Sequence, residues 1–131
     1  GFFSRCEGIE IMRDVLEIGR GAIRVLEDGT MPRAQCTLHE GDMYKSMQLC
    51  SDADLIFVYA TCFATTDGVT VRKLSNALAP HVKPEARVIT VNKRLSEDDD
   101  FELEQTFQGP NPDSVTNPAV AYVWRRKGAS A

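Results

Sequence analysis

The chain has 131 residues, of which 43% are hydrophobic and 26% are charged, a balance typical of a globular domain with one core. Its formal net charge of −4 excludes binding to nucleic acid through the overall electrostatic field, and its apolar runs are too short to cross a bilayer. Four scattered cysteines and two histidines give no metal-ligand spacing, and the first residues lack the pattern of a signal peptide. We therefore expect an intracellular domain with no metal, no membrane contact, no direct binding to nucleic acid, and reduced cysteines that lie mostly in the core.

The first predicted elements are a strand, a helix and a second strand. The first strand ends within CEGIEI (6–11), and apolar residues then recur over 12–26 at the i, i+3, i+4 and i+7 spacing of an amphipathic helix. Asp28-Gly29 ends this helix. Residues 34–39 alternate as a short strand, and residues 44–49 form a brief helical segment.

The second half of the chain begins with a strand that should be buried. Residues 55–60 are continuously apolar, which predicts burial on both faces, as in a parallel sheet that helices cover. A helix over 68–79 and a strand over 87–91 follow. Residues 101–107 and 119–125 are predicted as two further strands, and the Gly/Pro/Asn-rich loop between them is too short for a parallel crossover. This last pair is therefore expected to be antiparallel.

The alternation of strands and helices predicts an α/β fold. We expect a three-layer, Rossmann-like sheet that is mostly parallel and has an antiparallel C-terminal strand pair. In open sheets of this kind, ligands bind outside the carboxyl ends of the strands. Those ends carry Glu10, Asp42 with Met43, residues 59–63, and Asn92 with Lys93.

Glu10 is the first candidate, because this carboxylate stands between two isoleucines at the end of a strand. A buried charge without a partner is costly, so the side chain must reach water, a salt bridge or a ligand. Its two acceptor oxygens suit the two vicinal hydroxyls of a ribose. In the dinucleotide-binding pattern such an acid follows a glycine-rich loop by about 20 residues. Neither that loop nor the strand before it fits between Gly1 and Glu10, so we expect the sheet to lack its first strand.

The other strand-end residues have two interpretations each. Asp42 can accept from the exocyclic amine of a purine and Met43 can lie against the purine face, but Asp is also a preferred helix N-cap. Tyr59 and Phe63 can line a channel or can be ordinary core aromatics. Cys62 is interpreted as a packing residue, because nothing in the sequence places a base beside it.

The order of several segments resembles class I S-adenosylmethionine-dependent methyltransferases. These segments are GIEI (8–11), HEGDM (39–43), SDADLIFVYATCF (51–63) and LAPHVKPEARVITVNKRL (78–95), followed by the terminal strand pair. The runs DADLIFVYATCF, VITVNKRL and AVAYVWRRK are most similar to the non-SET histone-lysine methyltransferases of the disruptor-of-telomeric-silencing type. The resemblance implies that residues 1–131 form one partial methyltransferase domain without the glycine-rich first motif.

The resemblance also implies a cofactor, a substrate and roles for named residues. S-adenosyl-L-methionine would be the cofactor and a protein lysine, as in histones, the methyl acceptor, which implies a nuclear location if the acceptor is histone and a cytoplasmic one otherwise. Glu10 would hold the cofactor ribose with Ile11 beside it, and Asp42 and Met43 would contact adenine. The residues near the methionine end and the lysine channel would be Tyr59, Thr61 and Phe63, with Tyr59 also touching the cofactor.

Two departures from the family pattern concern single residues. The family often has Asn where Tyr59 stands, and it has glycine where Glu85 stands in a Lys-Pro-Gly turn. Two rival hypotheses remain at this point: a truncated, non-catalytic α/β module for protein interaction, and a nicotinamide-dependent Rossmann enzyme. The reversed terminal strand pair argues against the second of these.

Overall fold

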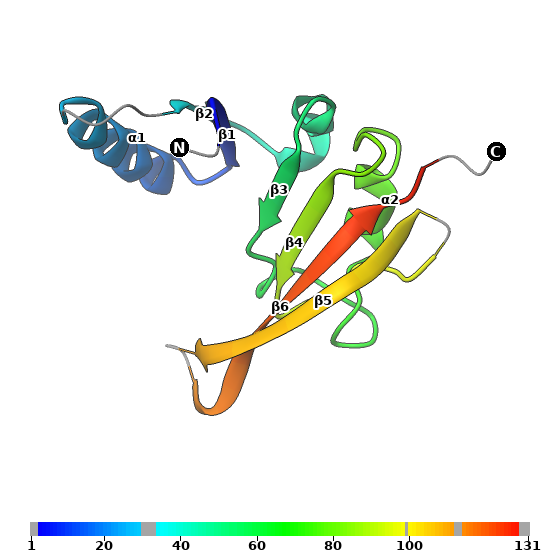
Figure 1. The fold of residues 1–131 in the computed structure, drawn as a ribbon. Helices are drawn as coiled ribbons and strands as arrows, with labels where there is room; N and C mark the ends of the chain where they lie inside the picture. The colour runs from blue at the N-terminus through cyan, green and yellow to red at the C-terminus, as the bar shows by residue number, and fades with distance from the viewer. Residues whose placement is uncertain (1–2, 30–33, 99, 112–113, 129–131) are drawn as a thin grey trace. The chain divides into compact units, whose positions relative to one another are not determined.

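The computed structural model describes residues 3–29, 34–98, 100–111 and 114–128 (Figure 1). The chain divides into two compact units, Gly1–Leu49 and Cys50–Ala131. Each unit has its own sheet.

The first unit is a parallel strand pair connected by a helix. The strands β1 (Arg5–Glu10) and β2 (Gln35–Glu40) flank α1 (Arg13–Glu27) in the chain, and their parallel register places Glu10 opposite Glu40. Two short 3₁₀ helices follow, η1 (Met43–Lys45) and η2 (Met47–Cys50). The predicted strand, helix, strand and helical segment are therefore all present.

Helix α1 approaches its sheet closely at Leu38 of β2. A Cβ added to Gly8 of β1 would lie 2.6 Å from Leu38 Cδ2, and one added to Gly19 of α1 would lie 2.8 Å from Leu38 Cδ1. The position of the helix was predicted correctly. Of the apolar stripe that defined it in the sequence, Leu16 is buried, whereas Met12, Val15 and Leu26 are exposed.

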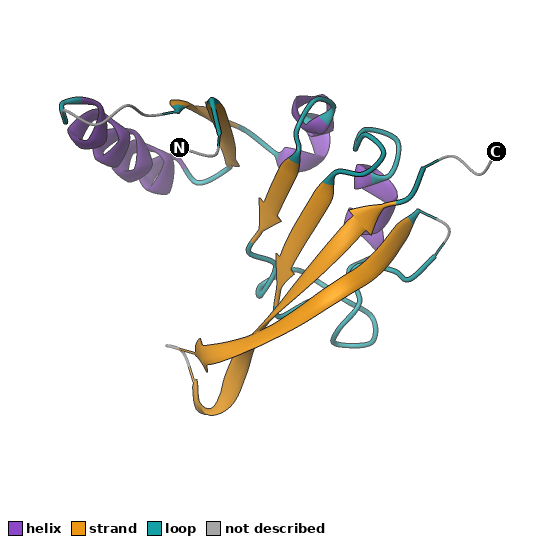
Figure 2. Cartoon of the chain, in the orientation of Figure 1, coloured by secondary structure: helices purple, strands orange, loops and turns teal. Residues whose placement is uncertain are grey.

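The second unit is a four-stranded mixed sheet with one helix. Its elements are β3 (Leu55–Val58), α2 (Arg72–Leu78), β4 (Arg87–Val91), β5 (Phe101–Asn111) and β6 (Ser114–Arg126). The strand order is β3-β4-β6-β5; β3 and β4 are parallel, and β6 is antiparallel to both of its neighbours. This confirms the predicted reversed strand pair, which forms the long twisted ribbon in Figure 2.

The core of the second unit lies around β4, β6 and α2. Val88, Leu74 and Trp124 are fully buried, and the Trp124 indole N–H donates to the buried Thr90 hydroxyl over 3.1 Å. The Arg126 guanidinium donates to the Ala79 carbonyl over 3.0 Å, which attaches the end of α2 to β6. The helix is therefore linked to the sheet through β6.

Strand β3 differs from its prediction. Its continuous apolar run indicates burial on both faces, but Phe57 is 63% exposed and Leu55 is also exposed. Leu55 and Phe57 alternate with the half-buried Ile56 and Val58, so the two exposed side chains lie on one face of the strand and that face is open. β3 is also an edge strand, paired only with β4 among the described residues. Likewise, no strand in the described part of the chain pairs with both β1 and β3.

The last two strands are longer than predicted, since most of the Gly/Pro/Asn-rich stretch is strand rather than loop. Pro110 lies in β5, which is at the edge of the sheet, and a proline is tolerated there because its missing N–H is not needed by a neighbour. The register is irregular between Gly109 and Asn111, as expected where a strand accommodates such residues.

The expectation of core cysteines is wrong. Cys6 and Cys62 are exposed, and Cys36 and Cys50 are only partly buried. Cys6 and Cys36 lie opposite each other on the two-stranded sheet, which is too small to bury both of its faces. All four are free thiols.

The described residues contain neither a candidate membrane-spanning helix nor a candidate metal site. No helix there is long and apolar enough to cross a membrane. Within the same ranges, no group of three or more His, Cys, Asp or Glu side chains is placed to hold a metal ion.

Candidate functional site

The first unit brings Glu10 and Asp42 to the same end of its sheet. The Gly41 N–H donates to the Glu10 carbonyl over 3.0 Å, so the chain that leaves β2 crosses the end of β1. This follows from the parallel pairing, because the carboxyl ends of parallel strands meet at one edge. The predicted neighbourhood of the two acids is therefore present within this unit.

The Glu10 residue is half-buried, and a backbone N–H two residues further along the chain orients its carboxylate. Its Oε1 accepts a hydrogen bond from the Met12 N–H over 2.8 Å, at the start of α1. Its Oε2 has no hydrogen-bond partner in the ranges that the structure describes. Ile11, the predicted neighbour in the cofactor site, is exposed. Glu10 thus has acceptor capacity left for a ligand or for water.

Asp42 acts as the N-cap of η1, as one of its two interpretations predicted. Its Oδ1 accepts from the Tyr44 N–H over 2.9 Å, and its backbone carbonyl accepts from the Lys45 N–H over 3.0 Å. Burial first, and the Asp42 charge second, raise the pKa of Tyr44 above its ordinary value. Met43 is half-buried on the same turn. The cap uses one carboxylate oxygen, so it does not exclude a ligand on the other.

In the second unit, the residues proposed for catalysis lie on one loop at the end of β3. Tyr59 is 53% exposed, whereas Ala60 beside it is fully buried. A turn follows, in which the Phe63 N–H donates to the Ala60 carbonyl over 3.0 Å. Thr61 and Phe63 are half-buried. Tyr59 and Phe63 are therefore not fully buried core aromatics, and both remain accessible at the loop.

Asn92 and Lys93 connect the end of β4 to that loop, a role that the sequence analysis did not predict. Asn92 has a positive φ of 61°, and its side-chain amide donates to Thr61 Oγ1 over 3.0 Å. Lys93 donates from Nζ to the Gly68 carbonyl over 2.7 Å. The only sequence signal for this arrangement is that Asn tolerates the left-handed conformation better than most residues.

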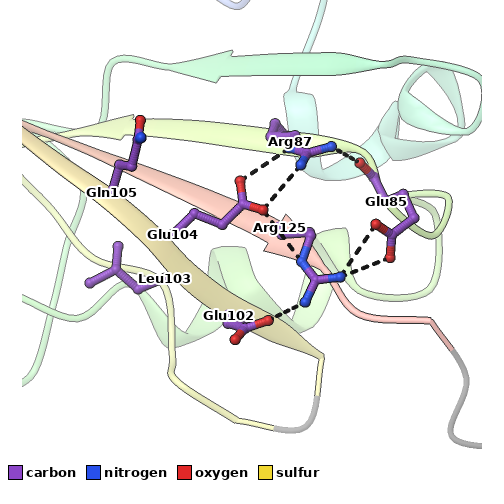
Figure 3. A pocket seen from close by; sticks show the side chains of 7 residues that line it. All are labelled: Glu85, Arg87, Glu102, Leu103, Glu104, Gln105 and Arg125. Carbon is purple, nitrogen blue, oxygen red and sulfur yellow. Dashed lines mark hydrogen bonds and ion pairs between the residues drawn. The ribbon is translucent and has the colours of Figure 1, made fainter.

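A hollow in the second unit lies away from this loop. It is lined by Glu85, Arg87, Glu102, Leu103, Glu104, Gln105 and Arg125 (Figure 3). These residues come from the starts of β4 and β5 and the end of β6, which is the end of the sheet opposite to residues 59–63.

The polar side chains of this hollow are largely paired with one another. Arg125 contacts the carboxylates of Glu85 at 3.0 Å and Glu104 at 3.4 Å and also pairs with Glu102, while Arg87 binds Glu104 at 3.1 Å. The hydrogen bonds that Arg125 donates to the carboxylates of Glu102 and Glu85 raise the pKa of Arg125. We interpret these ion pairs as contacts that connect β4, β5 and β6 rather than as a ligand site.

Glu85 itself occupies the turn where the resemblance expected glycine. Its φ is 66°, and the Ala86 N–H donates to the Lys83 carbonyl over 3.3 Å. A positive φ at this position of a turn is the conformation that favours glycine. This turn therefore holds a non-glycine residue in a strained backbone conformation, next to the ion pair with Arg125.

Comparisons with known proteins bear on the fold. No protein-family model matches the sequence, and no curated protein matches it. The structure is similar to the N-methyltransferase NodS from Bradyrhizobium japonicum WM9, with a TM-score of 0.60 and 14% identity, over 95% of this chain and 74% of that chain. It is also similar to an rRNA methylase from Streptococcus thermophilus, with a TM-score of 0.55 and 6% identity, again over 95% of this chain and 74% of that one.

These likenesses, at such low identity, establish the fold. The predicted α/β, Rossmann-like fold with an antiparallel C-terminal strand pair is confirmed. The strand pairings that the structure describes are two parallel and two antiparallel, so parallel pairing does not predominate among them. The roles predicted for Glu10, Ile11, Asp42, Met43 and the loop residues stay predictions.

Proposed function

We propose that this chain binds S-adenosyl-L-methionine and serves methyl transfer to a lysine side chain of a protein, as in histones. The observation that carries the proposal is the strand arrangement: a parallel β1–β2 pair, and β3-β4-β6-β5 with β6 reversed, in a chain whose fold is similar to two methyltransferases. The acceptor is proposed from the sequence resemblance, which is analogy.

The strand-end residues suit the chemical groups of this cofactor. Glu10 offers a carboxylate oxygen that accepts no hydrogen bond from the described residues, and vicinal ribose hydroxyls need such acceptors. Asp42 retains one oxygen beyond its cap, which suits the amine of adenine, and the half-buried Met43 thioether suits an aromatic face. When bound, the cofactor would supply a methyl group activated by its sulfonium.

The residues of the loop at 59–63 would favour the neutral form of the acceptor lysine. A lysine must be neutral to act as a nucleophile, and an apolar, desolvated channel lowers the pKa of an ammonium group. Tyr59 and Phe63 would form walls of such a channel. Displacement at a methyl group depends mainly on positioning and on exclusion of water, so no general base is assigned.

Cofactor binding tests the first half of the proposal. We would titrate the protein with S-adenosylhomocysteine by calorimetry and compare Glu10→Ala with Glu40→Gln, a control at the opposite register position. The Glu10→Ala variant loses charged hydrogen bonds to the ribose, so its affinity for S-adenosylhomocysteine should fall about 10-fold or more, the equivalent of about 1.5 kcal/mol. Absence of binding by the unchanged protein would refute the proposal, and equal affinity in Glu10→Ala would remove Glu10 from the site.

The acceptor is tested separately with a radiolabelled methyl donor. Core histones and ribosomal RNA would be offered in parallel, and label should appear on lysine in the histones. Label on RNA alone would refute the lysine acceptor while leaving methyl transfer in place.

A second candidate function is a non-catalytic module for protein interaction. It is favoured by exposed apolar side chains in each unit, such as Ile18 on α1 and Phe57 on β3, because such side chains beside unpaired strand edges promote association. This alternative predicts concentration-dependent self-association in sedimentation equilibrium together with no cofactor binding. A monomer that binds the cofactor would exclude it.

A further inference from the structure

Asn92 stands at the exit of β4 in a backbone conformation that most side chains avoid. Its φ is 61°, and its N–H donates to the Val120 carbonyl over 2.7 Å. Residues held in the left-handed region persist where surrounding contacts determine them, and they cluster at sites where a side chain must be aimed. The contacts of this side chain show where it is aimed.

The two ends of the Asn92 amide serve two different segments. Its Oδ1 accepts from the Val120 N–H over 2.9 Å, and its Nδ2 donates to Thr61 Oγ1 over 3.0 Å. The orientation is fixed by chemistry, because a backbone N–H can only donate and must face the oxygen. The amide nitrogen is therefore directed at Thr61.

This bond constrains the Thr61 hydroxyl as well as the loop. A hydroxyl has one proton and two lone pairs, and here one lone pair is taken by Asn92. The hydroxyl proton then points away from Asn92 and can be donated to another group. Thr61 is half-buried, so its hydroxyl is held without being fully enclosed.

The residues after Asn92 hold the far end of the same loop. Lys93 Nζ donates to the Gly68 carbonyl over 2.7 Å, and the Arg94 N–H donates to the Val69 carbonyl over 2.9 Å. The loop that carries Thr61 and Phe63 is thus anchored at both ends by the exit of β4. The Asn92 bond is the anchor beside the residues proposed for catalysis.

We propose that Asn92 is a positioning residue that sets the Thr61 hydroxyl and the loop at 59–63 for methyl transfer. It acts through Thr61 and not on the substrate itself. The inference rests on the proposed function, and the test below separates the failure of one from the failure of the other.

The test uses variants that remove one function of the amide at a time. Thr61→Val removes the acceptor of the Asn92 bond and so breaks it. Asn92→Asp keeps the acceptor for Val120 but reverses the bond to Thr61, because a carboxylate accepts and so takes up the proton of the Thr61 hydroxyl. Thr61→Ser restores the hydroxyl and serves as the conservative rescue. Asn76→Asp, at an exposed position on α2, is the matched control for the change of charge.

The first readout is amide hydrogen exchange, which does not depend on activity. In Thr61→Val, exchange of the Phe63 N–H, which donates to the Ala60 carbonyl, should become about 10-fold faster, while Val120 stays protected by the Asn92 Oδ1 that this change leaves in place. Asn76→Asp should leave both unchanged. Unchanged exchange of the Phe63 N–H in Thr61→Val would overturn the inference, whether or not the protein transfers methyl groups.

The second readout is methyl transfer. Asn92→Asp and Thr61→Val should each lower kcat about 10-fold with the cofactor Kd within twofold of the parent value, and Thr61→Ser should recover most of the loss. The double variant should be no slower than either single one, because both changes act on the same Thr61 hydroxyl, one by removing it and the other by taking up its proton. Faster exchange with unchanged kcat, or additive losses, would overturn the positioning role, whereas an unchanged protein without transfer activity would refute the proposed function instead.

Discussion

The Asp42 carboxylate accepts a hydrogen bond from the Tyr44 N–H over 2.9 Å, and its charge contributes, after burial, to a raised pKa of the Tyr44 phenol. The same side chain is thus a structural cap and a candidate ligand for adenine. These two roles make different demands, since a cap needs any acceptor oxygen and a purine amine is bound best by a charged one. Substitutions at this position separate them.

Asp42→Asn should keep the cap, because Asn is as good a capping residue as Asp, whereas Asp42→Ala should lower the free energy of unfolding by about 1 kcal/mol. Urea denaturation followed by circular dichroism measures both. The pKa of Tyr44 should fall in Asp42→Asn but stay above its ordinary value, because burial is the larger cause. Equal stability of Asp42→Ala and the unchanged protein would contradict the cap.

Replacing two glycines of α1 by alanine should change the stability of the protein to different extents. An added Cβ at Gly21 meets nothing within 4 Å, whereas one at Gly19 would lie 2.8 Å from Leu38 Cδ1. Gly21→Ala should stabilise the protein by up to about 1 kcal/mol through helix propensity. Gly19→Ala should be less stable than Gly21→Ala by about 1–3 kcal/mol, the usual cost of overpacking.

Thermal unfolding of the two variants side by side checks this difference. Leu38→Ala provides the control, because it removes the atom that the new Cβ would meet. The cost of Gly19→Ala should then largely disappear. A persistent cost in the double variant would mean that Leu38 is not the obstacle.

Much of the fold follows from patterns that are local in the sequence. The period of the apolar residues in 12–26 located a helix that the structure places at Arg13–Glu27, and the short connection before residue 119 indicated the antiparallel pair. The exposure of Phe57 was not predictable in this way. An apolar run indicates that a strand can be buried, but the elements that pack on each face of the sheet decide whether its side chains are.

The candidate site was predictable to the extent that topology fixes it. Glu10 and Asp42 come together because parallel strands end at one edge, and this follows from the strand order alone. The roles of Asn92 and Glu85 depend on a positive φ at each position. Contacts between residues as distant in sequence as Thr61, Asn92 and Val120 leave no periodic signal. The sequence could therefore indicate only that residue 92 is an asparagine, a residue that tolerates a positive φ.

Thr90→Val should destabilise the second unit by leaving a buried donor without its acceptor. The Thr90 hydroxyl accepts from the Trp124 indole over 3.1 Å, and both residues have an exposed fraction of 0%. An unsatisfied buried donor costs about 1–3 kcal/mol. Urea unfolding followed by fluorescence is a direct readout, because Trp124 is the single tryptophan.

Thr90→Ser is the matched control for that variant. It keeps the hydroxyl and removes only a methyl group, so it should be more stable than Thr90→Val despite its smaller side chain. If the valine variant proved the more stable of the two, packing would outweigh the hydrogen bond at this position.

Asp67 should give the protein a stability that depends on pH in acid. The backbone N–H groups of Thr70, at 2.6 Å, and Val69, at 2.9 Å, donate to its Oδ1, and these bonds lower its pKa to about 2. Because the pKa is lower in the folded protein than the ordinary 3.8, the unfolded chain binds the proton more tightly. The stabilisation is therefore fully present above about pH 4 and is lost as the pH falls through 2.

The Asp67 titration can be followed by carboxyl-carbon NMR, with an expected midpoint near the lowered value. Asp67→Asn keeps an acceptor for the two amides but cannot titrate, so its stability should fall less steeply between pH 4 and pH 2 than that of the unchanged protein. A midpoint at the ordinary value, or parallel stability curves for the two proteins, would show that the amides of Val69 and Thr70 do not hold the carboxylate in solution. In that case the start of α2 would have to be fixed by the backbone bonds between the Val71 N–H and Arg94 carbonyl, at 2.9 Å, and between the Arg94 N–H and Val69 carbonyl.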